Sequence, residues 1–202
     1  MAVKRIHLNV GAWQERSVAN GPGERFVLWL QGCPVLCPGC FNEELLPFVP
    51  RHLITVEAMA DRILAVPSIE GVTYTGGEPT VQAQGLALLS ERLRACGLTV
   101  VCYTGYTLEA LQARHDLWID RLLSEVDVLI DGPFVRDQGT NLLWRGSSNQ
   151  RVRFLTDVYR HLAGDVDCSP AQVEFAIGSK EFLTTGTWPQ GFLERLREVL
   201  GR

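Results

Sequence analysis

The chain has 202 residues, of which 46% are hydrophobic and 21% charged, and its formal net charge is −4. This composition is ordinary for a soluble globular protein, and the length is enough to bury a sizeable core. The weakly acidic balance gives no indication of direct nucleic-acid binding. No apolar run approaches the length that spans a membrane, and the first residues lack a signal-peptide pattern. We therefore expect a single cytoplasmic domain over residues 1–202, with no membrane contact.

Short apolar runs alternate with amphipathic stretches along most of the chain. In chain order the sequence predicts strands at 5–10 and 26–30, a helix at 55–66, a strand at 71–74 and a helix at 81–95. A strand at 98–102, helices at 108–114 and 119–124, strands at 126–130, 152–155 and 173–177, and a helix at 191–200 follow. This alternation predicts an α/β fold with a parallel sheet, outer helices and right-handed crossovers. Because there are too few units for a complete eight-stranded barrel, we expect an open, partial β/α barrel.

Three cysteines, Cys33, Cys37 and Cys40, lie in one short loop directly after the predicted strand 26–30. Thiolates are soft ligands that bind zinc, copper(I) or iron–sulfur clusters. A structural zinc site needs four ligands, and neither the other three cysteines nor the four histidines form a second ligand pair. A four-iron cluster normally takes four cysteines, so three would leave one iron open to another ligand. A zinc site that borrows a distant fourth ligand stays an alternative.

A second motif, Gly76–Gly77–Glu78, follows the predicted strand 71–74. Paired glycines allow a backbone to approach a ligand closely and to expose its N–H and C=O groups. Since ligand sites of α/β folds lie at the carboxyl ends of strands, we expect this motif to lie beside the cysteine loop.

The CxxxCxxC spacing and the GGE triplet together resemble the radical S-adenosylmethionine (SAM) enzymes. More specific stretches lie at residues 20–25 (NGPGER), 37–42 (CPGCFN), 103–109 (YTGYTLE), 127–134 (DVLIDGPF) and 144–151 (WRGSSNQR). In this order they resemble the activating proteins of anaerobic (class III) ribonucleotide reductase, which belong with the glycyl-radical-enzyme activases. The resemblance covers residues 20–151. Residues 152–202 extend beyond it, and we expect them to pack on or complete the domain.

The resemblance implies a cofactor set and a role for each matching residue. It implies a [4Fe-4S] cluster on the three cysteines and SAM on the open iron, with the GGE residues holding the amino-acid end of SAM. It implies that Gly39 and Phe41 lie near the adenine. Thr104, and less directly Asp131, are candidates for contacts with the SAM carboxylate or ribose, or they cap a turn or helix.

The family reaction is also implied. Flavodoxin or ferredoxin would reduce the cluster, SAM would be cleaved to methionine and a 5′-deoxyadenosyl radical, and this radical would take a hydrogen from a glycine of the partner reductase. Two other functions stay open: a radical SAM enzyme acting on a small molecule or peptide, and an iron–sulfur redox or sensor module without SAM cleavage. Residues 144–151 are either a docking or site-covering loop, or a solvated loop.

Overall fold

The computed structural model of the chain describes residues 5–177, 182–188 and 191–201. It is an α/β protein with one seven-stranded sheet, in the order β3-β1-β2-β4-β5-β6-β7, and a separate two-stranded sheet of β8 and β9. The large sheet consists of β1 (His7–Ser17), β2 (Arg25–Leu30), β3 (His52–Thr55), β4 (Gly71–Gly76), β5 (Thr99–Thr104), β6 (Val128–Asp131) and β7 (Arg151–Phe154). The helices are α1 (Val56–Leu64), α2 (Ala83–Arg94), α3 (Leu108–Gln112), α4 (Leu117–Glu125) and α5 (Phe192–Leu200).

The centre of the large sheet is parallel, but its edges are not. Strands β2, β4, β5 and β6 pair in parallel, whereas β1 pairs antiparallel with both β2 and β3, and β7 pairs antiparallel with β6. The predicted parallel sheet is therefore confirmed at the centre and wrong at both edges. The parallel strands are joined through helices, as βα crossovers require, while the strands β1 and β2 are joined by the short turn at 18–24, which can only reverse direction.

The helices α1, α3 and α4 each begin after a side-chain amino-terminal cap. The Thr55 hydroxyl accepts a hydrogen bond from the Ala58 N–H at 3.2 Å, and Thr107 does the same for Ala110. The Asp116 carboxylate accepts from two backbone N–H groups at the start of α4. Such caps satisfy amide groups that a helix leaves unpaired at its start. Two strands were not predicted: β3, and β9 (Phe182–Gly186), which pairs antiparallel with β8 (Val173–Ile177).

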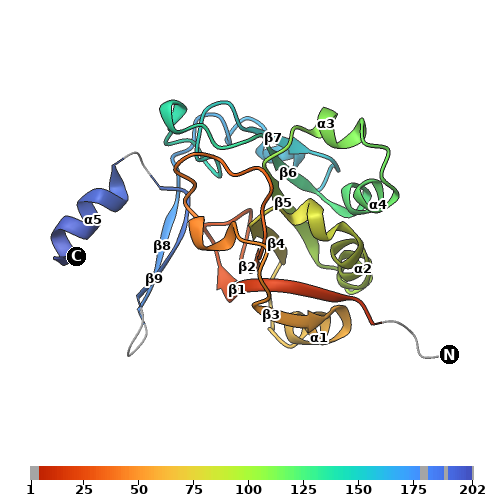
Figure 1. Cartoon of the computed structure of the whole chain (residues 1–202). Coiled ribbons are helices and arrows are strands. Elements are labelled where there is room, and N and C mark those ends of the chain that lie inside the picture. Colours follow the sequence, from red (N-terminus) through yellow and green to blue (C-terminus); the bar gives the residue numbers. More distant parts are fainter. Residues whose placement is uncertain (1–4, 178–181, 189–190, 202) are drawn as a thin grey trace.

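The hydrophobic core lies on the two faces of the sheet. Helices α1, α2 and α4 cover one face, as Figure 1 shows, and the main cluster lies between them and the central strands. On the opposite face, a smaller cluster joins Val101 and Ile130 to Leu143, Trp144 and Tyr159 from the later part of the chain. The segment after β7 is thus packed on the side of the sheet that the helices leave open.

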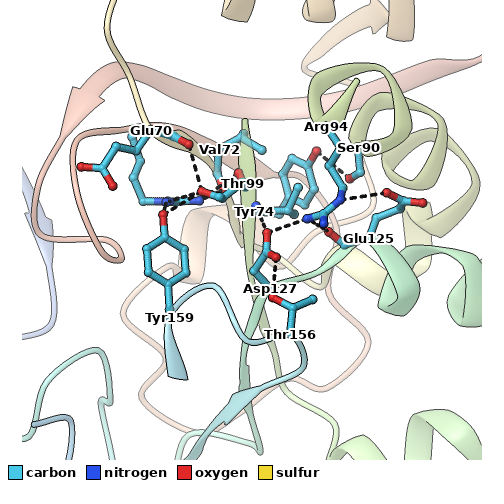
Figure 2. Close-up of polar contacts among 12 residues, drawn as sticks. Glu70, Val72, Tyr74, Ser90, Arg94, Thr99, Glu125, Asp127, Thr156 and Tyr159 are labelled. Carbon is cyan, nitrogen blue, oxygen red and sulfur yellow. Dashed lines mark hydrogen bonds and ion pairs between the residues drawn. The ribbon is translucent and has the colours of Figure 1, made fainter. Parts of the chain in front are cut away.

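A polar network closes the amino-terminal edge of the parallel strands (Figure 2). The side chain of Arg25 is fully buried and donates hydrogen bonds to Thr73, Thr99 and Tyr159 and to backbone carbonyls, including those of Pro22 and Val72. Nearby, the buried carboxylate of Asp127 accepts from Arg94 at 2.7 Å and from Thr156 at 2.6 Å. Tyr159 and Thr156 therefore fasten the chain beyond β7 to the base of the sheet.

The β8–β9 hairpin is fastened to the loop between β1 and β2. The Ser17 hydroxyl donates to the Glu174 carboxylate at 2.6 Å, and the Asn20 side chain donates to the Thr185 hydroxyl at 2.8 Å. Phe192 at the start of α5 stacks on Trp188 with ring centroids 5.5 Å apart. The side chains of Leu193 and Leu200 in the same helix lie outside the described residues. Within the part of the chain that the structure describes, no helix is both long enough and apolar enough to cross a bilayer.

Candidate active site

A cavity opens at the carboxyl-terminal edge of the parallel strands, opposite the Arg25 network. It contains about 1000 Å³ of space, open solvent at its mouth included. Its walls come from the ends of β2, β4 and β5, from the cysteine loop, from the loop before β7, and from the end of β9. All three cysteines, Gly76, Gly77 and Glu78 line it. The expected neighbourhood of the two motifs is therefore present in the structure.

The cysteine loop is held by backbone hydrogen bonds on both sides. The Gly32 N–H donates to Leu45 at 2.8 Å, and the Cys33 N–H donates to Leu46 at 3.0 Å. Within the loop, the Cys40 N–H donates to the Cys37 carbonyl at 3.1 Å. These bonds fix where the loop leaves β2 and where it turns, so the three thiols are presented from a defined backbone.

The thiols are free and differ in burial: Cys33 is buried, whereas Cys37 and Cys40 are half-buried. Desolvation raises the pKa of Cys33 and that of Cys40 above the ordinary thiol value. Metal binding must therefore displace a proton from each of these thiols. Among the described residues, no group of three or more His, Cys, Asp or Glu side chains is arranged to hold one metal ion. In a four-iron cluster each cysteine binds a different iron, and the three thiols of this loop line one cavity.

The glycines of the GGE motif are required by the protein's own backbone. The Gly77 N–H donates to the Leu30 carbonyl at 2.8 Å, and the Glu78 N–H donates to the Gly32 carbonyl at 3.0 Å. A Cβ atom on Gly77 would lie 2.5 Å from the Gly32 oxygen, and one on Gly76 would lie 2.7 Å from the Leu30 nitrogen. The sequence had indicated close approach to a ligand. The structure shows close approach to the start of the cysteine loop, so the two motifs are one hydrogen-bonded unit.

The carboxylate of Glu78 is almost completely buried and has several partners. Its Oε1 accepts from the Thr80 N–H at 3.0 Å, from the Thr80 hydroxyl at 2.7 Å and from the Thr104 hydroxyl at 3.0 Å, and its Oε2 accepts from the Gly105 N–H at 2.8 Å. Burial raises the pKa of Glu78, and these hydrogen bonds oppose that shift. Glu78 thus ties the end of β4 to the end of β5, and Oε2 keeps one acceptor position for a ligand.

Of the remaining predicted site residues, Phe41 and Thr104 line the cavity and Gly39 does not. Phe41 lines the cavity and contacts Phe134, with ring centroids 4.8 Å apart. Gly39 is outside the described lining and faces the side chain of Arg136. Thr104 lines the cavity, but its hydroxyl donates to Glu78 and accepts from the Tyr106 N–H at 3.2 Å.

Asp131 contacts the protein's own backbone and side chains. Its carboxylate is fully buried, accepts from the Leu108 N–H at the start of α3 and pairs with Arg151 at 3.2 Å. It is also outside the described lining of the cavity. The capping interpretation of Asp131 accounts for these contacts.

The segment 144–151 forms part of the cavity wall. Trp144, Gly146 and Gln150 line the cavity, and the side-chain oxygen of Gln150 accepts from the Gly146 N–H at 2.8 Å. The Gln150 amide group donates to the Gly132 carbonyl at 3.0 Å, which holds the segment against the end of β6. Since Trp144 and Arg145 are buried, the solvated-loop interpretation was wrong.

Sequence reasoning missed the wall built by Thr184, Thr185, Gly186, Thr187 and Trp188. These residues follow no ligand-binding motif, and β9 itself was not predicted. No signal in the sequence alone could have placed them beside the cysteines.

The fold and the site define a class: an α/β protein with a three-cysteine loop at the carboxyl edge of its sheet. The family model of the "4Fe-4S single cluster domain" matches residues 19–153, which include the cysteine loop and the GGE motif. The chain is 34% identical over 158 residues to the anaerobic ribonucleoside-triphosphate reductase-activating protein of Escherichia coli K12, covering 73% of this chain and 99% of that protein. It therefore belongs to the family of anaerobic ribonucleoside-triphosphate reductase-activating proteins.

One further relative and one solved structure are also similar to this chain. The protein of the same name from Enterobacteria phage T4 is 33% identical over 150 residues, covering 70% of this chain and 92% of that protein. Among solved structures, QueE from Escherichia coli is similar over 52% of this chain and 55% of that chain, with 19% identity and a TM-score of 0.41.

Proposed function

We propose that this chain is a radical SAM enzyme that generates a glycyl radical on an anaerobic ribonucleoside-triphosphate reductase. The relatives that bear the name of such activating proteins support the reaction. The observation that carries the proposal is that three thiols and the backbone of Gly76 and Gly77 line one cavity. Cys33, Cys37 and Cys40 would hold a [4Fe-4S] cluster, and the cavity beside them would hold SAM.

The residues present fit these two groups. Three free thiols from one fixed loop leave one iron of a four-iron cluster without a protein ligand. The free acceptor position on Glu78 Oε2 and the backbone at Gly76 suit the amino group of SAM, and Phe41 offers an aromatic face for the adenine. When bound, the cluster and SAM supply reductive cleavage of the sulfonium and removal of a hydrogen atom from a glycine.

The protein's own contribution is to orient these groups and to keep water away from them. The hydrogen bonds from Gly77 and Glu78 to Leu30 and Gly32 fix the distance between the cysteine loop and the SAM-binding backbone. The buried aromatic side chains of Trp144 and Trp188 close the opposite part of the cavity.

Four further features belong to the proposal. The central parallel strands would curve as an open, partial β/α barrel around the cavity. The chain would act as one domain, because the β8–β9 hairpin is hydrogen-bonded to Ser17 and Asn20. A flavodoxin or ferredoxin would supply the electron. Gly39, Thr104 and Asp131 would act through the loop and the strand ends rather than by direct contact, since their described contacts are with the protein.

The test is anaerobic reconstitution with iron and sulfide, followed by incubation with SAM, a strong reductant and the reductase. We expect 5′-deoxyadenosine and a glycyl radical signal in electron paramagnetic resonance. Cys37→Ser should lose both signals together with stable iron, whereas Cys96→Ser, at an exposed cysteine outside the cavity, is the matched control. 5′-Deoxyadenosine without a glycyl radical on any reductase would instead indicate a small-molecule or peptide substrate. Iron without SAM cleavage would indicate a redox or sensor module.

A further inference from the structure

Two segments from the later part of the chain form much of the cavity wall, residues 144–150 and residues 184–188. Each carries a buried tryptophan that lines the cavity, Trp144 in the first and Trp188 in the second. The proposed reaction takes place on a protein, so the entrance has to admit part of a macromolecule. Widening the entrance for such a partner requires that one of these two segments can move.

Residues 144–150 are fixed to the large sheet. Trp144 and its neighbour Leu143 belong to the core cluster that lies on β5 and β6. The Asn149 side chain donates to the Pro133 carbonyl at 2.7 Å, directly after β6. Moving this segment would expose buried apolar surface of the core, which is costly, so we do not expect it to form the entrance.

The β8–β9 hairpin is attached in a different way. Its two strands pair with each other in a sheet that is separate from the large one. Of the side chains that the structure describes in residues 173–188, none belongs to either core cluster. Figure 1 shows the two strands (blue) along one side of the molecule, with α5 beyond them. A unit with few buried apolar contacts opens at a lower free energy than the core, so the hairpin can detach while the large sheet stays folded.

The polar contacts that hold the hairpin are concentrated at one rung. Glu174 of β8 and Thr185 of β9 lie opposite each other in the hairpin register. The Glu174 carboxylate accepts from the Ser17 hydroxyl at 2.6 Å and from the Val18 N–H at 3.2 Å. The Thr185 hydroxyl accepts from the Asn20 side chain at 2.8 Å. Because hydrogen bonds to a charged acceptor are the stronger kind, Glu174 is the main fastening point.

The chain that leads into β8 remains attached when this rung opens. The Ala171 N–H donates to the Asn141 carbonyl at 2.6 Å, which holds the incoming chain beside residues 141–143. The next residue, Gln172, is exposed, and its carbonyl accepts from the Thr187 N–H at 3.0 Å. The base of the hairpin is therefore closed within itself, and the backbone between residues 171 and 172 is the place where it can pivot.

We propose that residues 173–177 and 182–188 form a flap over the cavity, latched closed by Glu174 and Thr185 and opened to admit the partner protein. The inference rests on the proposed function, because only a macromolecular substrate needs this entrance. The matched part of the Escherichia coli relative covers 73% of this chain and 99% of that protein. An alignment of that extent that includes the cysteine loop ends before β9, so the flap is an addition of this chain to the site of that relative.

The test measures amide hydrogen exchange of the full-length protein by mass spectrometry, before and after reconstitution with iron and sulfide. Glu174→Ala removes the charged acceptor of the latch and leaves the cavity lining unchanged. Amides of residues 182–188 should then exchange about 10-fold faster or more, whereas amides of β4 and β5 and the urea midpoint should not change. Glu174→Gln, which keeps an acceptor oxygen without the charge, should give an intermediate rate. Glu15→Ala, which removes an exposed carboxylate on β1, is the matched control.

The kinetic measurement is the KM for the reductase. A closed flap lowers the fraction of molecules that can bind the partner, so Glu174→Ala should lower this KM about 3- to 10-fold. A residue that only supported the fold would raise the KM or lower the yield of folded protein when it is removed. An unchanged or raised KM in Glu174→Ala would overturn the role of the flap as an entrance.

The outcomes for the flap and for the proposed function can be told apart. If the wild-type amides of residues 173–177 and 182–188 exchange only together with those of β4 and β5, the hairpin opens only by global unfolding and the inference is overturned. Unchanged exchange in Glu174→Ala would overturn the latch. If exchange shows local opening but no glycyl radical forms on any reductase, the proposed function is wrong, and the flap then has no protein to admit.

Discussion

Replacing Gly77 with alanine tests whether the GGE motif and the cysteine loop form one unit. The added Cβ would lie 2.5 Å from the Gly32 oxygen and 2.9 Å from the Leu30 oxygen, and both are backbone atoms that cannot rotate away. Non-bonded carbon contacts are about 3.5–4.0 Å, so the two segments must separate. The hydrogen bonds from Gly77 to Leu30 and from Glu78 to Gly32 lie directly in this path.

The magnitude follows from those two hydrogen bonds. Each is worth about 0.5–1.5 kcal/mol net, so the free energy of unfolding of the metal-free protein should fall by about 1–3 kcal/mol. With a urea m-value of about 2 kcal/mol/M, the unfolding midpoint should fall by about 0.5–1.5 M. Since the cysteine loop moves, iron content after reconstitution should fall as well.

The assay is urea unfolding followed by circular dichroism, with iron and sulfide measured on the reconstituted protein. Gly164→Ala is the matched control, because its Cβ would meet no atom within 4 Å and its φ is not in the positive region. That variant should change the free energy of unfolding by less than about 1 kcal/mol. If Gly77→Ala keeps both the wild-type midpoint and the wild-type iron content, the close backbone contact is not what requires glycine there.

Two further predictions concern buried polar groups on opposite edges of the sheet. Tyr159→Phe removes the hydroxyl that bonds Arg25 and Thr99, so the free energy of unfolding should fall by about 1–3 kcal/mol. The amount of iron bound by the cysteines should not change. An unchanged urea midpoint would contradict the anchoring role of Tyr159. Glu78→Gln removes a carboxylate whose pKa is raised by burial, and a raised pKa means that the folded state holds the proton more tightly. The stability of the wild type relative to Glu78→Gln should therefore be largest below about pH 4, near the unfolded-state pKa of glutamate, and should decrease as the pH rises. A difference between the two proteins that is constant from pH 3 to 7 would show that Glu78 does not titrate in this way.

The sequence predicted the parts of the fold that local chemistry determines. The apolar run 26–30 is β2, Thr55 begins the helix predicted at 55–66, and the cysteine loop and GGE motif meet at the strand ends. In each case a few neighbouring residues carry the information: hydrophobic periodicity, a cap, or ligand spacing. The family resemblance stated from these motifs was confirmed by the family model and the relatives.

What sequence reasoning missed depends on contacts between distant residues. β1 pairs antiparallel with β3 across residues 18–51, and β7 pairs antiparallel with β6 across residues 132–150. The end of β9 lines the same cavity as the cysteine loop, which lies far away in the sequence. The reason for glycine at position 77 also became clear only when Leu30 and Gly32 were in place beside it. None of these contacts leaves a periodic pattern in the sequence.

The position of the β8–β9 hairpin has a consequence for how the protein is made. Thr187 and Trp188 come long after the cysteine loop in the sequence, yet they line the same cavity as the thiols. During synthesis the cysteines are therefore made well before the residues of this wall, and the enclosure is complete only once residues 184–188 have been added and folded. Delivery of iron and sulfide can precede that moment, whereas full protection of the bound metal from oxygen cannot.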